Sequence, residues 1–215
     1  MRIVIVGAGL AGLTAARRLV DDHHVTVLDK GRSVGGRLAT RRIGDAVLDH
    51  GAQFFTVRGD EFRSQVDRWI ERGLVHVWCH GFDAEADGHP RYVGSAGMNS
   101  LAKDLARGLA PRTGQFVFTL RRREEGWDVV IDDGSVVEAD AVILTCPVAQ
   151  AWALLVESDV TIPDELFRSA YHRTIGLLVT LDRPSAVPEP GGVQFDPTDA
   201  EQPFGFIGDN QAKGI

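Results

Sequence analysis

The N-terminal part of the chain has the apolar pattern of two buried strands joined by a helix. The run RIVIV at 2–6 is short, continuous and β-branched, which is typical of a parallel strand buried on both faces. The run VTVLD at 25–29 repeats that pattern. Between the two runs, apolar residues recur at helical spacing, at Leu10, Leu13, Ala16 and Val20. The pattern therefore predicts a strand, a helix and a second strand, the βαβ unit.

Two more helices are predicted further along the chain. Asp60 is placed to cap the first of them and Gly73 to end it, and its apolar face would consist of Phe62, Val66, Trp69 and Ile70. Asn99 or Ser100 would cap the second helix, which ends near Gly108 and aligns Leu101, Leu105 and Leu109.

Strands and turns are predicted for the remaining patterned segments. VHVWCH at 75–80 alternates as a strand does, and the glycine- and charge-rich stretch 81–91 is interpreted as a loop near which the chain crosses between domains. Residues 115–144 alternate in segments, and Asp133 followed by Gly134 is a strong hairpin signal. The order of elements predicts an α/β fold.

Three glycines occupy the first turn of the βαβ unit in the spacing GxGxxG. Gly7 would permit the tight turn, Gly9 would let the backbone approach a pyrophosphate, and Gly12 would let helix and strand pack closely. The helix N-terminus offers unpaired N–H groups to an anion. Asp29 ends the second strand, where its carboxylate could accept hydrogen bonds from a ribose and would repel a 2′-phosphate. This pattern predicts dinucleotide binding and disfavours NADP, but it does not separate NAD from FAD.

A second glycine-rich turn, DKGRSVGGRLATRR at 29–42, does favour FAD. A domain for NAD usually continues from the acidic residue into its next crossover, whereas here Gly31, Gly35 and Gly36 let the chain fold back toward the cofactor. Arg37 can meet phosphate oxygens in fork geometry. A solvated basic loop would account for Arg41 and its neighbour but not for the paired glycines.

With this second turn the sequence resembles the flavoprotein amine oxidase superfamily. The segments LDHGAQFFTVR at 48–58, YVGSAGMNSLAKDLA at 92–106 and VILTCPVAQAWALL at 142–155 resemble, more narrowly, the renalase-like bacterial flavoproteins. The resemblance implies a Rossmann-like FAD-binding domain, formed by residues 1–56 and 91–156, interleaved with a mixed-sheet substrate domain of residues 57–90 and 157–215. Relatives normally continue for roughly another third of their length, so the chain is expected to be truncated at its C-terminus.

The resemblance also implies which residues meet the cofactor and the substrate. Those expected to line FAD are Gly7, Gly9, Leu10, Ala11, Gly12, Asp29, Lys30, Gly36, Arg37, Gln53, Phe54, Phe55 and, by strand backbone pairing with adenine, Val117. Candidate substrate contacts are His50, Gln53, Tyr171 and His172, for each of which ordinary packing is an alternative. No catalytic base is identified.

An oxidase activity follows from this resemblance. Side chains cannot carry two-electron transfer, so bound FAD would accept a hydride and pass the electrons to O₂. The renalase group implies dihydro isomers of NAD(P)H as substrates, and the superfamily implies amines; no residue decides between them. Two alternatives stay open: a dinucleotide-binding module that does not turn over, and an NAD-dependent dehydrogenase.

Composition narrows the setting of this chemistry. The chain has 30 acidic and 23 basic residues and a net charge of −7, which disfavours nucleic acid as a partner. Two cysteines without CxxC spacing argue against a disulfide framework and favour the cytoplasm. The apolar region 141–156 is shorter than the about 20 residues of a membrane span. Oligomeric state stays open.

Two other clusters are interpreted as structural. His76 and His80 would share one face of a strand and Cys79 the other, so no metal site is expected there. The stretch GSAG at 94–97 lacks the spacing of a nucleophile elbow, so serine catalysis is not expected.

Overall fold

The chain forms two compact units that interleave along the sequence. The computed structural model describes residues 1–82, 87–196, 198–199 and 201–215. One unit consists of residues 1–37 and 102–175, and the other of residues 38–101 and 176–215. The interleaving of a Rossmann-like unit with a second unit is confirmed. The predicted boundaries of the FAD-binding and substrate domains differ from this division. They stay a prediction, because a division into compact units does not show which residues touch a cofactor.

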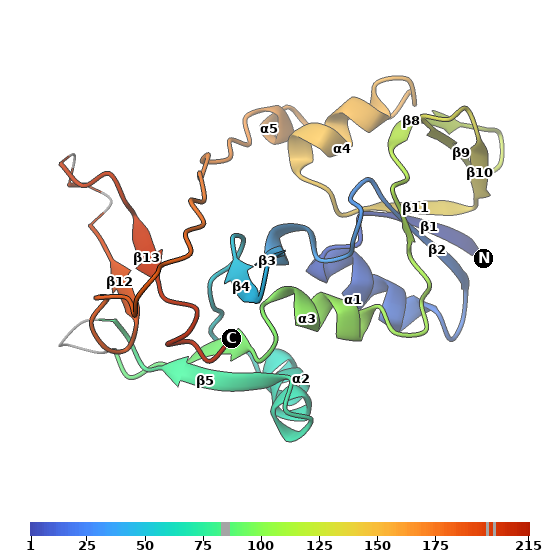
Figure 1. Cartoon of the computed structure of the whole chain (residues 1–215). Coiled ribbons are helices and arrows are strands. Elements are labelled where there is room, and N and C mark those ends of the chain that lie inside the picture. The colour runs from blue at the N-terminus through green and yellow to red at the C-terminus, as the bar shows by residue number, and fades with distance from the viewer. Residues whose placement is uncertain (83–86, 197, 200) are drawn as a thin grey trace. The chain divides into compact units, whose positions relative to one another are not determined.

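A four-stranded parallel sheet is the centre of the first unit. Its order is β11 (Ala141–Leu144), β1 (Arg2–Val6), β2 (His24–Asp29) and β7 (Arg112–Thr113). Figure 1 shows β11 beside β1, although the two strands lie far apart in the sequence. Val6 is in register with Leu28 on one side and with Leu144 on the other. The carboxyl ends of three strands therefore meet at one edge of the sheet, where an open α/β sheet binds its ligands.

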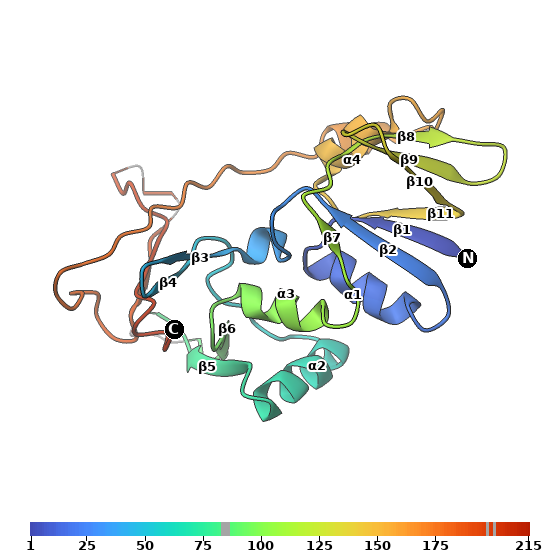
Figure 2. The ribbon, with the colours of Figure 1, turned by 45° about the vertical axis from the view of Figure 1, so that its right-hand side comes forward.

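The parallel sheet is covered on both faces. Helix α1 (Leu10–Leu19) packs Leu13 and Ala16, both fully buried, against one face. On the other lies an antiparallel sheet of order β10 (Val136–Ala139), β9 (Trp127–Ile131) and β8 (Val117–Arg122), as Figure 2 shows. Helices α4 (Val148–Leu155) and α5 (Asp164–Phe167) follow β11. Each strand of the βαβ unit thus needs apolar residues on both sides, which explains its continuous apolar run.

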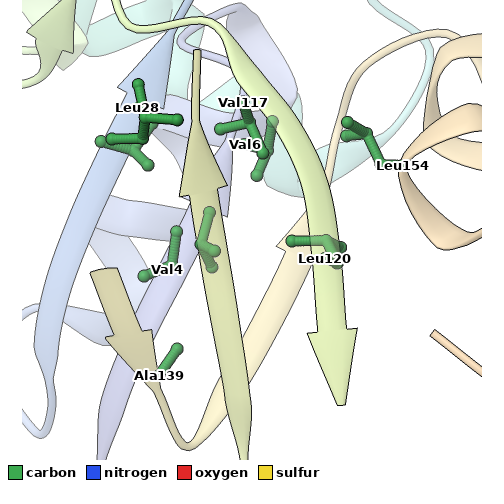
Figure 3. Packing of buried hydrophobic residues seen from close by; sticks show 9 residues of the cluster. Val4, Val6, Leu28, Val117, Leu120, Ala139 and Leu154 are labelled. Carbon is green, nitrogen blue, oxygen red and sulfur yellow. The ribbon is translucent and has the colours of Figure 1, made fainter. Parts of the chain in front are cut away.

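One hydrophobic cluster joins the two sheets of the first unit. It draws on β1, β2, β8, β9, β10 and α4 (Figure 3), and its buried members are Val4, Val6, Leu28, Val117, Leu120, Val129, Ile131, Ala139 and Leu154. The predicted hairpin between β9 and β10 is confirmed: Gly134 has φ +84° and its N–H donates to Ile131 C=O at 2.9 Å.

The second unit is built from short antiparallel pairs. These are β3 (Thr40–Ile43) with β4 (Ala46–Asp49), β5 (Val75–Cys79) with β6 (Arg91–Gly94), and β12 (Gly192–Gln194) with β13 (Phe206–Gly208). A 3-10 turn (Gly36–Leu38) precedes them, and α2 (Asp60–Glu71) and α3 (Asn99–Leu105) complete the set. Among the described residues these pairs do not join into one mixed sheet. Residues 83–86 of the predicted loop 81–91 lie outside the described residues.

Aromatic rings supply much of the apolar interior of the second unit. Phe54, Trp78, Phe82 and Phe206 form one cluster, with ring centroids 5.0 to 6.4 Å apart. Phe55, Phe62, Trp69 and Tyr92 form a second, with centroids 5.5 to 6.5 Å apart. Neighbouring residues Phe54 and Phe55 point into different clusters, as alternating side chains of an extended segment do.

The predicted helix caps are wrong. Gly59 is the N-cap of α2 and Asp60 is already its first helical residue. At the start of α3, the side-chain oxygens of Asn99 and Ser100 are buried without a hydrogen-bond partner among the described residues. That helix begins on groups from elsewhere: Asp49 Oδ1 accepts from Met98 N–H at 2.9 Å, and Thr40 Oγ1 accepts from Asn99 N–H at 3.0 Å.

Candidate functional site

The first glycine turn has the geometry that its sequence predicts. Gly7 has φ +114°, a conformation that favours glycine, and its N–H donates to Leu28 C=O at 2.7 Å. A Cβ on Gly12 would stand 1.9 Å from Gly7 O, so any side chain there would push α1 off the strand. By contrast, a Cβ on Gly9 would find its nearest atom 4.0 Å away, so this stretch of backbone is open to a ligand.

The second glycine turn lies directly against the first. Gly35 N–H donates to Ala8 C=O at 2.9 Å, and Gly9 and Gly35 form a parallel bridge. A Cβ on Gly36 would stand 3.6 Å from Gly9 Cα. The two turns therefore form one continuous backbone surface at the carboxyl edge of the parallel sheet.

Asp29 fastens the two turns to each other. Its Oδ2 accepts from Ala8 N–H and its Oδ1 from Gly31 N–H, both at 2.6 Å. These short, charge-assisted bonds make the carboxylate a part of the cradle itself. Each oxygen keeps a second lone pair, so acceptance from a ribose hydroxyl, the predicted role, is compatible with this geometry and stays a prediction.

Thr145 is a member of the site that the sequence analysis missed. It follows β11, and its Oγ1 lies 3.0 Å from Val6 O and 3.2 Å from Gly7 O, to which it can donate. A Cβ on Gly7 would stand 2.5 Å from that oxygen. The sequence signal for Thr145 was its position as the first residue after the apolar strand β11, which pairs with β1.

The basic side chains near the cradle differ in whether they have hydrogen-bond partners. Lys30 Nζ donates to Gln150 Oε1 at 3.1 Å. Arg37 is exposed, and within the described part of the chain no group forms a hydrogen bond or ion pair with it. Leu10 and Ala11, in the first turn of α1, are also exposed, as contact with a ligand at the helix N-terminus requires.

Val117 sits at the start of β8. The residue is 5% exposed and its side chain belongs to the core cluster, so the predicted pairing with adenine would have to use its backbone and stays a prediction. The register of β8 against β9 shifts between Val117 and Thr119, which interrupts the ladder at this point.

Gln53, from the second unit, is held at both ends of its carboxamide. Its Nε2 donates to Asp49 C=O at 2.7 Å, and its Oε1 accepts from Lys213 Nζ at 2.6 Å. Phe54 and Phe55 lie in the two aromatic clusters. The structure thus gives all three residues intramolecular contacts, and their contact with FAD stays a prediction.

Lys213 is a second residue that the sequence analysis missed. It is 1% exposed, and burial lowers the pKa of its ammonium to about 8, although the charges of Asp49 and Asp209 act in the opposite direction. A buried ammonium is costly and is rare outside functional or paired settings. A single lysine in a polar C-terminal stretch gave no signal of this burial.

The candidate substrate residues are divided between the units. His50 belongs to the second unit and is exposed. Tyr171 and His172 belong to the first unit; Tyr171 is 49% exposed, and its Oη accepts from Val148 N–H at 3.0 Å. A shared substrate site stays a prediction.

The histidine and cysteine residues on β5 have separate surroundings. His76 Nε2 lies 2.6 Å from Lys213 O and therefore donates to it, while Nδ1 lies 3.2 Å from Ser95 Oγ. Cys79 is buried with a free thiol. In the described ranges no group of three or more metal-ligating side chains comes together.

The fold and the double glycine cradle define a protein of the Rossmann-type dinucleotide-binding class. Residues 5–69 match the family model of the NAD(P)-binding Rossmann-like domain, and residues 74–181 match that of the flavin containing amine oxidoreductases. The chain belongs to the flavin-containing amine oxidoreductase family, which confirms the resemblance drawn from the second glycine turn.

Curated relatives agree with this family. Over 164 residues the chain is 26% identical to renalase of Mus musculus, covering 69% of this chain and 48% of renalase. Over 109 residues it is 33% identical to coproporphyrinogen III oxidase of Mycobacterium leprae (strain TN), covering 49% of this chain and 23% of that enzyme. The chain thus spans about half the length, or less, of these relatives.

Solved structures share the fold at low identity. A putrescine oxidase redesigned in its cofactor binding aligns with a TM-score of 0.60 and 18% identity, over 78% of this chain and 62% of that one. A fatty acid isomerase from P. acnes aligns with a TM-score of 0.56 and 16% identity, over 74% and 61%. The fold therefore serves different reactions and does not by itself fix the substrate.

No helix within the described ranges is both long enough and apolar enough to cross a bilayer.

Proposed function

We propose that the protein is an FAD-dependent oxidoreductase that takes a hydride from a reduced small molecule and passes the electrons to O₂. The observation that carries the proposal is the joining of two glycine turns into one backbone surface by Asp29 and by the Gly35 to Ala8 hydrogen bond. A single turn suffices for a pyrophosphate, and a second one supports a longer cofactor. Membership in a flavin-containing family supports FAD over NAD.

The residues of the cradle fit such a cofactor. Gly9 leaves the backbone open where a diphosphate would approach, and the first turn of α1 presents N–H groups that have no partner within the helix. Arg37 is exposed and uncommitted, so its guanidinium can bind phosphate oxygens in fork geometry. Asp29 disfavours a 2′-phosphate at the adenosine end.

The chemistry would be divided between cofactor and chain. Bound FAD supplies a two-electron acceptor, which O₂ reoxidises with two protons to give hydrogen peroxide. The chain binds and orients both partners; removal of a hydride from a dihydropyridine leaves no proton that a side chain must take. We infer a dihydro isomer of NAD(P)H or an amine as substrate, with His50, Gln53, Tyr171 and His172 as its candidate contacts.

The first experiment asks whether the purified protein carries a flavin. We expect a yellow protein with the absorption spectrum of oxidised flavin, which bleaches when it is mixed anaerobically with a dihydro-NAD(P) isomer or an amine. Recovery of intact protein that never binds a flavin would overturn the proposal. Colourless protein that binds NAD tightly would instead favour a dehydrogenase.

Two arginines of the second turn provide a matched pair of variants. We expect Arg37→Met to weaken FAD binding about tenfold or more, the effect of one charge-assisted phosphate contact. Arg32→Met removes the same charge from the same turn, where the side chain is also exposed. Equal losses in both variants would mean that only the general charge of the loop matters.

A non-catalytic binding module is the second candidate function. A protein that retains flavin but is bleached by neither substrate class would support this module.

A cytoplasmic location and O₂ as acceptor stay predictions.

A further inference from the structure

The carboxamide of Gln53 has one fixed orientation. An ammonium only donates hydrogen bonds, so Lys213 Nζ at 2.6 Å identifies the Gln53 oxygen, and the Gln53 nitrogen must then face Asp49 C=O at 2.7 Å. A weaker contact of the same nitrogen, 3.3 Å from Gly51 C=O, closes the turn. Lys213 therefore decides which way the amide points and, through it, the shape of residues 49–53.

Lys213 itself is held rigidly by its surroundings. Its backbone N–H donates to Asp209 C=O at 3.1 Å, and its backbone C=O accepts from His76 Nε2 at 2.6 Å. Gly208 of β13 packs beside this pair: a Cβ there would stand at ordinary contact distance, 3.4 Å from Lys213 Cε and 3.5 Å from Gln53 Oε1. The ammonium thus reaches Gln53 from a turn that follows β13 and is hydrogen-bonded to His76 of β5.

Stability does not explain a lysine at this place. Within the described part of the chain no carboxylate lies within 4.0 Å of the ammonium, whose other contacts are Asn210 Oδ1 at 3.3 Å and the Trp78 ring, 5.2 Å from its centroid. A buried charge without a paired countercharge costs free energy, and an apolar residue of the same length would avoid that cost. The ammonium must serve another purpose.

A buried carboxylate oxygen on the same turn is a second observation that supports a functional role for this turn. Asp49 is 3% exposed; its Oδ1 accepts from Thr40 and Met98, but its Oδ2 has no hydrogen-bond partner among the described residues. The turn 49–53 therefore carries an uncommitted buried acceptor at one end and the Gln53 and Lys213 pair at the other. A buried polar atom without a partner is uncommon in native proteins and calls for an explanation, of which a functional role is one.

We propose that Lys213 is a positioning residue of the flavin site: it orients Gln53 and thereby fixes the turn 49–53 for contact with cofactor or substrate. The inference rests on the proposed function, because only the resemblance directs this turn toward the flavin. Lys213 acts through Gln53 and takes no part in hydride transfer.

The electrostatic surroundings make this device sensitive to pH. The charged or titratable groups around the ammonium are Asp49 on β4, Asp209 on its own turn and His76 on β5, with Arg91 of β6 beyond the aromatic cluster. Loss of the Lys213 proton near pH 8 removes the charge that strengthens the hydrogen bond to Gln53 Oε1, so this bond should weaken as pH rises through that value.

The test begins with NMR on the purified protein, which needs no bound flavin. The chain has three lysines, so the Lys213 side-chain signals can be assigned by comparison with Lys30 and Lys103. We expect Lys213 to titrate near pH 8 and the Gln53 side-chain amide signals to move with the same midpoint. Gln53 signals that ignore this titration would overturn the proposal. Gln53→Glu should raise the Lys213 midpoint, and an unchanged midpoint would also contradict it.

The second arm measures flavin binding and turnover. We expect Lys213→Met to weaken flavin binding or raise KM about tenfold or more, as the loss of one hydrogen bond to a charged group does. When Lys213→Met is added to Gln53→Leu, it should cause no further loss of flavin binding or turnover. Lys103→Met, an exposed lysine on α3, is the control and should have no effect. Additive losses, or full binding and turnover in Lys213→Met, would overturn the positioning role, whereas a wild type without flavin would overturn the proposed function alone.

Discussion

Two aspartates in the molecule have similar structural roles but use their carboxylate oxygens differently. Asp29 ends β2 and Asp49 ends β4, and each fastens two separate segments through its carboxylate. Asp29 uses both oxygens, on backbone N–H groups 21 and 2 residues away in sequence. Asp49 uses one oxygen, on groups 9 and 49 residues away, and leaves the other without a partner among the described residues.

The difference shows how local and tertiary contacts divide the molecule. The two glycine turns are joined by contacts among the first 35 residues, so the Asp29 carboxylate is satisfied before any ligand binds. The turn 49–53 depends on Lys213, 160 residues beyond Gln53. Its polar groups remain partly uncommitted, as expected of a region whose contacts are completed elsewhere.

The largest effect should come from filling the cradle. Gly12→Ala places a methyl group 1.9 Å from Gly7 O, a backbone atom that cannot move aside. We expect a loss of about 3 kcal/mol or more in the free energy of unfolding, measured by denaturant titration. Gly205→Ala is the control, since a Cβ there meets nothing within 4 Å. Equal stability of the two variants would contradict the close packing of α1.

Replacing each aspartate by asparagine tests the comparison directly. In Asp29→Asn one oxygen becomes an NH₂ group that faces a backbone N–H, so we expect a loss of about 1.5 to 3 kcal/mol. In Asp49→Asn the NH₂ group can replace the unpartnered oxygen, and the loss should stay below about 1 kcal/mol. A larger loss for Asp49→Asn would show that its free oxygen has a partner in solution.

The pH dependence of stability should reveal Lys213. Between about pH 8 and 10.5 the native state has lost this proton while the unfolded state retains it, so stability increases with pH. One such group contributes at most about 1.4 kcal/mol per pH unit. Urea unfolding across this range should show a slope for the wild type that exceeds that of Lys213→Met, since other groups such as Cys146 titrate in both; parallel curves would contradict the burial of the ammonium.

The smallest effect should separate a tertiary helix cap from a local one. Thr40 Oγ1 donates to Asp49 at 2.6 Å and accepts from Asn99 N–H, whereas the Asn99 side-chain oxygen has no partner in the described ranges. We expect Thr40→Val to cost about 1 kcal/mol and Asn99→Ala less, measured by thermal unfolding. The reverse order would restore Asn99 as the cap.

The elements that could be predicted from sequence share one property, which is that their determinants lie close together along the chain. The βαβ unit, the hairpin at Asp133 and Gly134, and the roles of Gly7 and Gly12 all follow from neighbouring residues. The family resemblance could also be drawn from sequence, because the second glycine turn at 29–42 follows the first one within a short stretch.

What sequence patterns could not predict are the partners brought together by folding. Local capping rules assign the start of α3 to Asn99 or Ser100, yet Thr40 of β3 and Asp49 of β4 perform that role. Thr145 joins the cradle only because β11 pairs with β1.

By itself, the amino-acid sequence determined the glycine cradle and the apolar strands around it, since backbone conformation and periodic burial depend on residues near one another. Only the tertiary structure decided that Lys213 is buried against Gln53 and that Asp49 keeps a free oxygen. Burial and pairing of a charge depend on whatever the fold places beside it, and no local pattern records that neighbour.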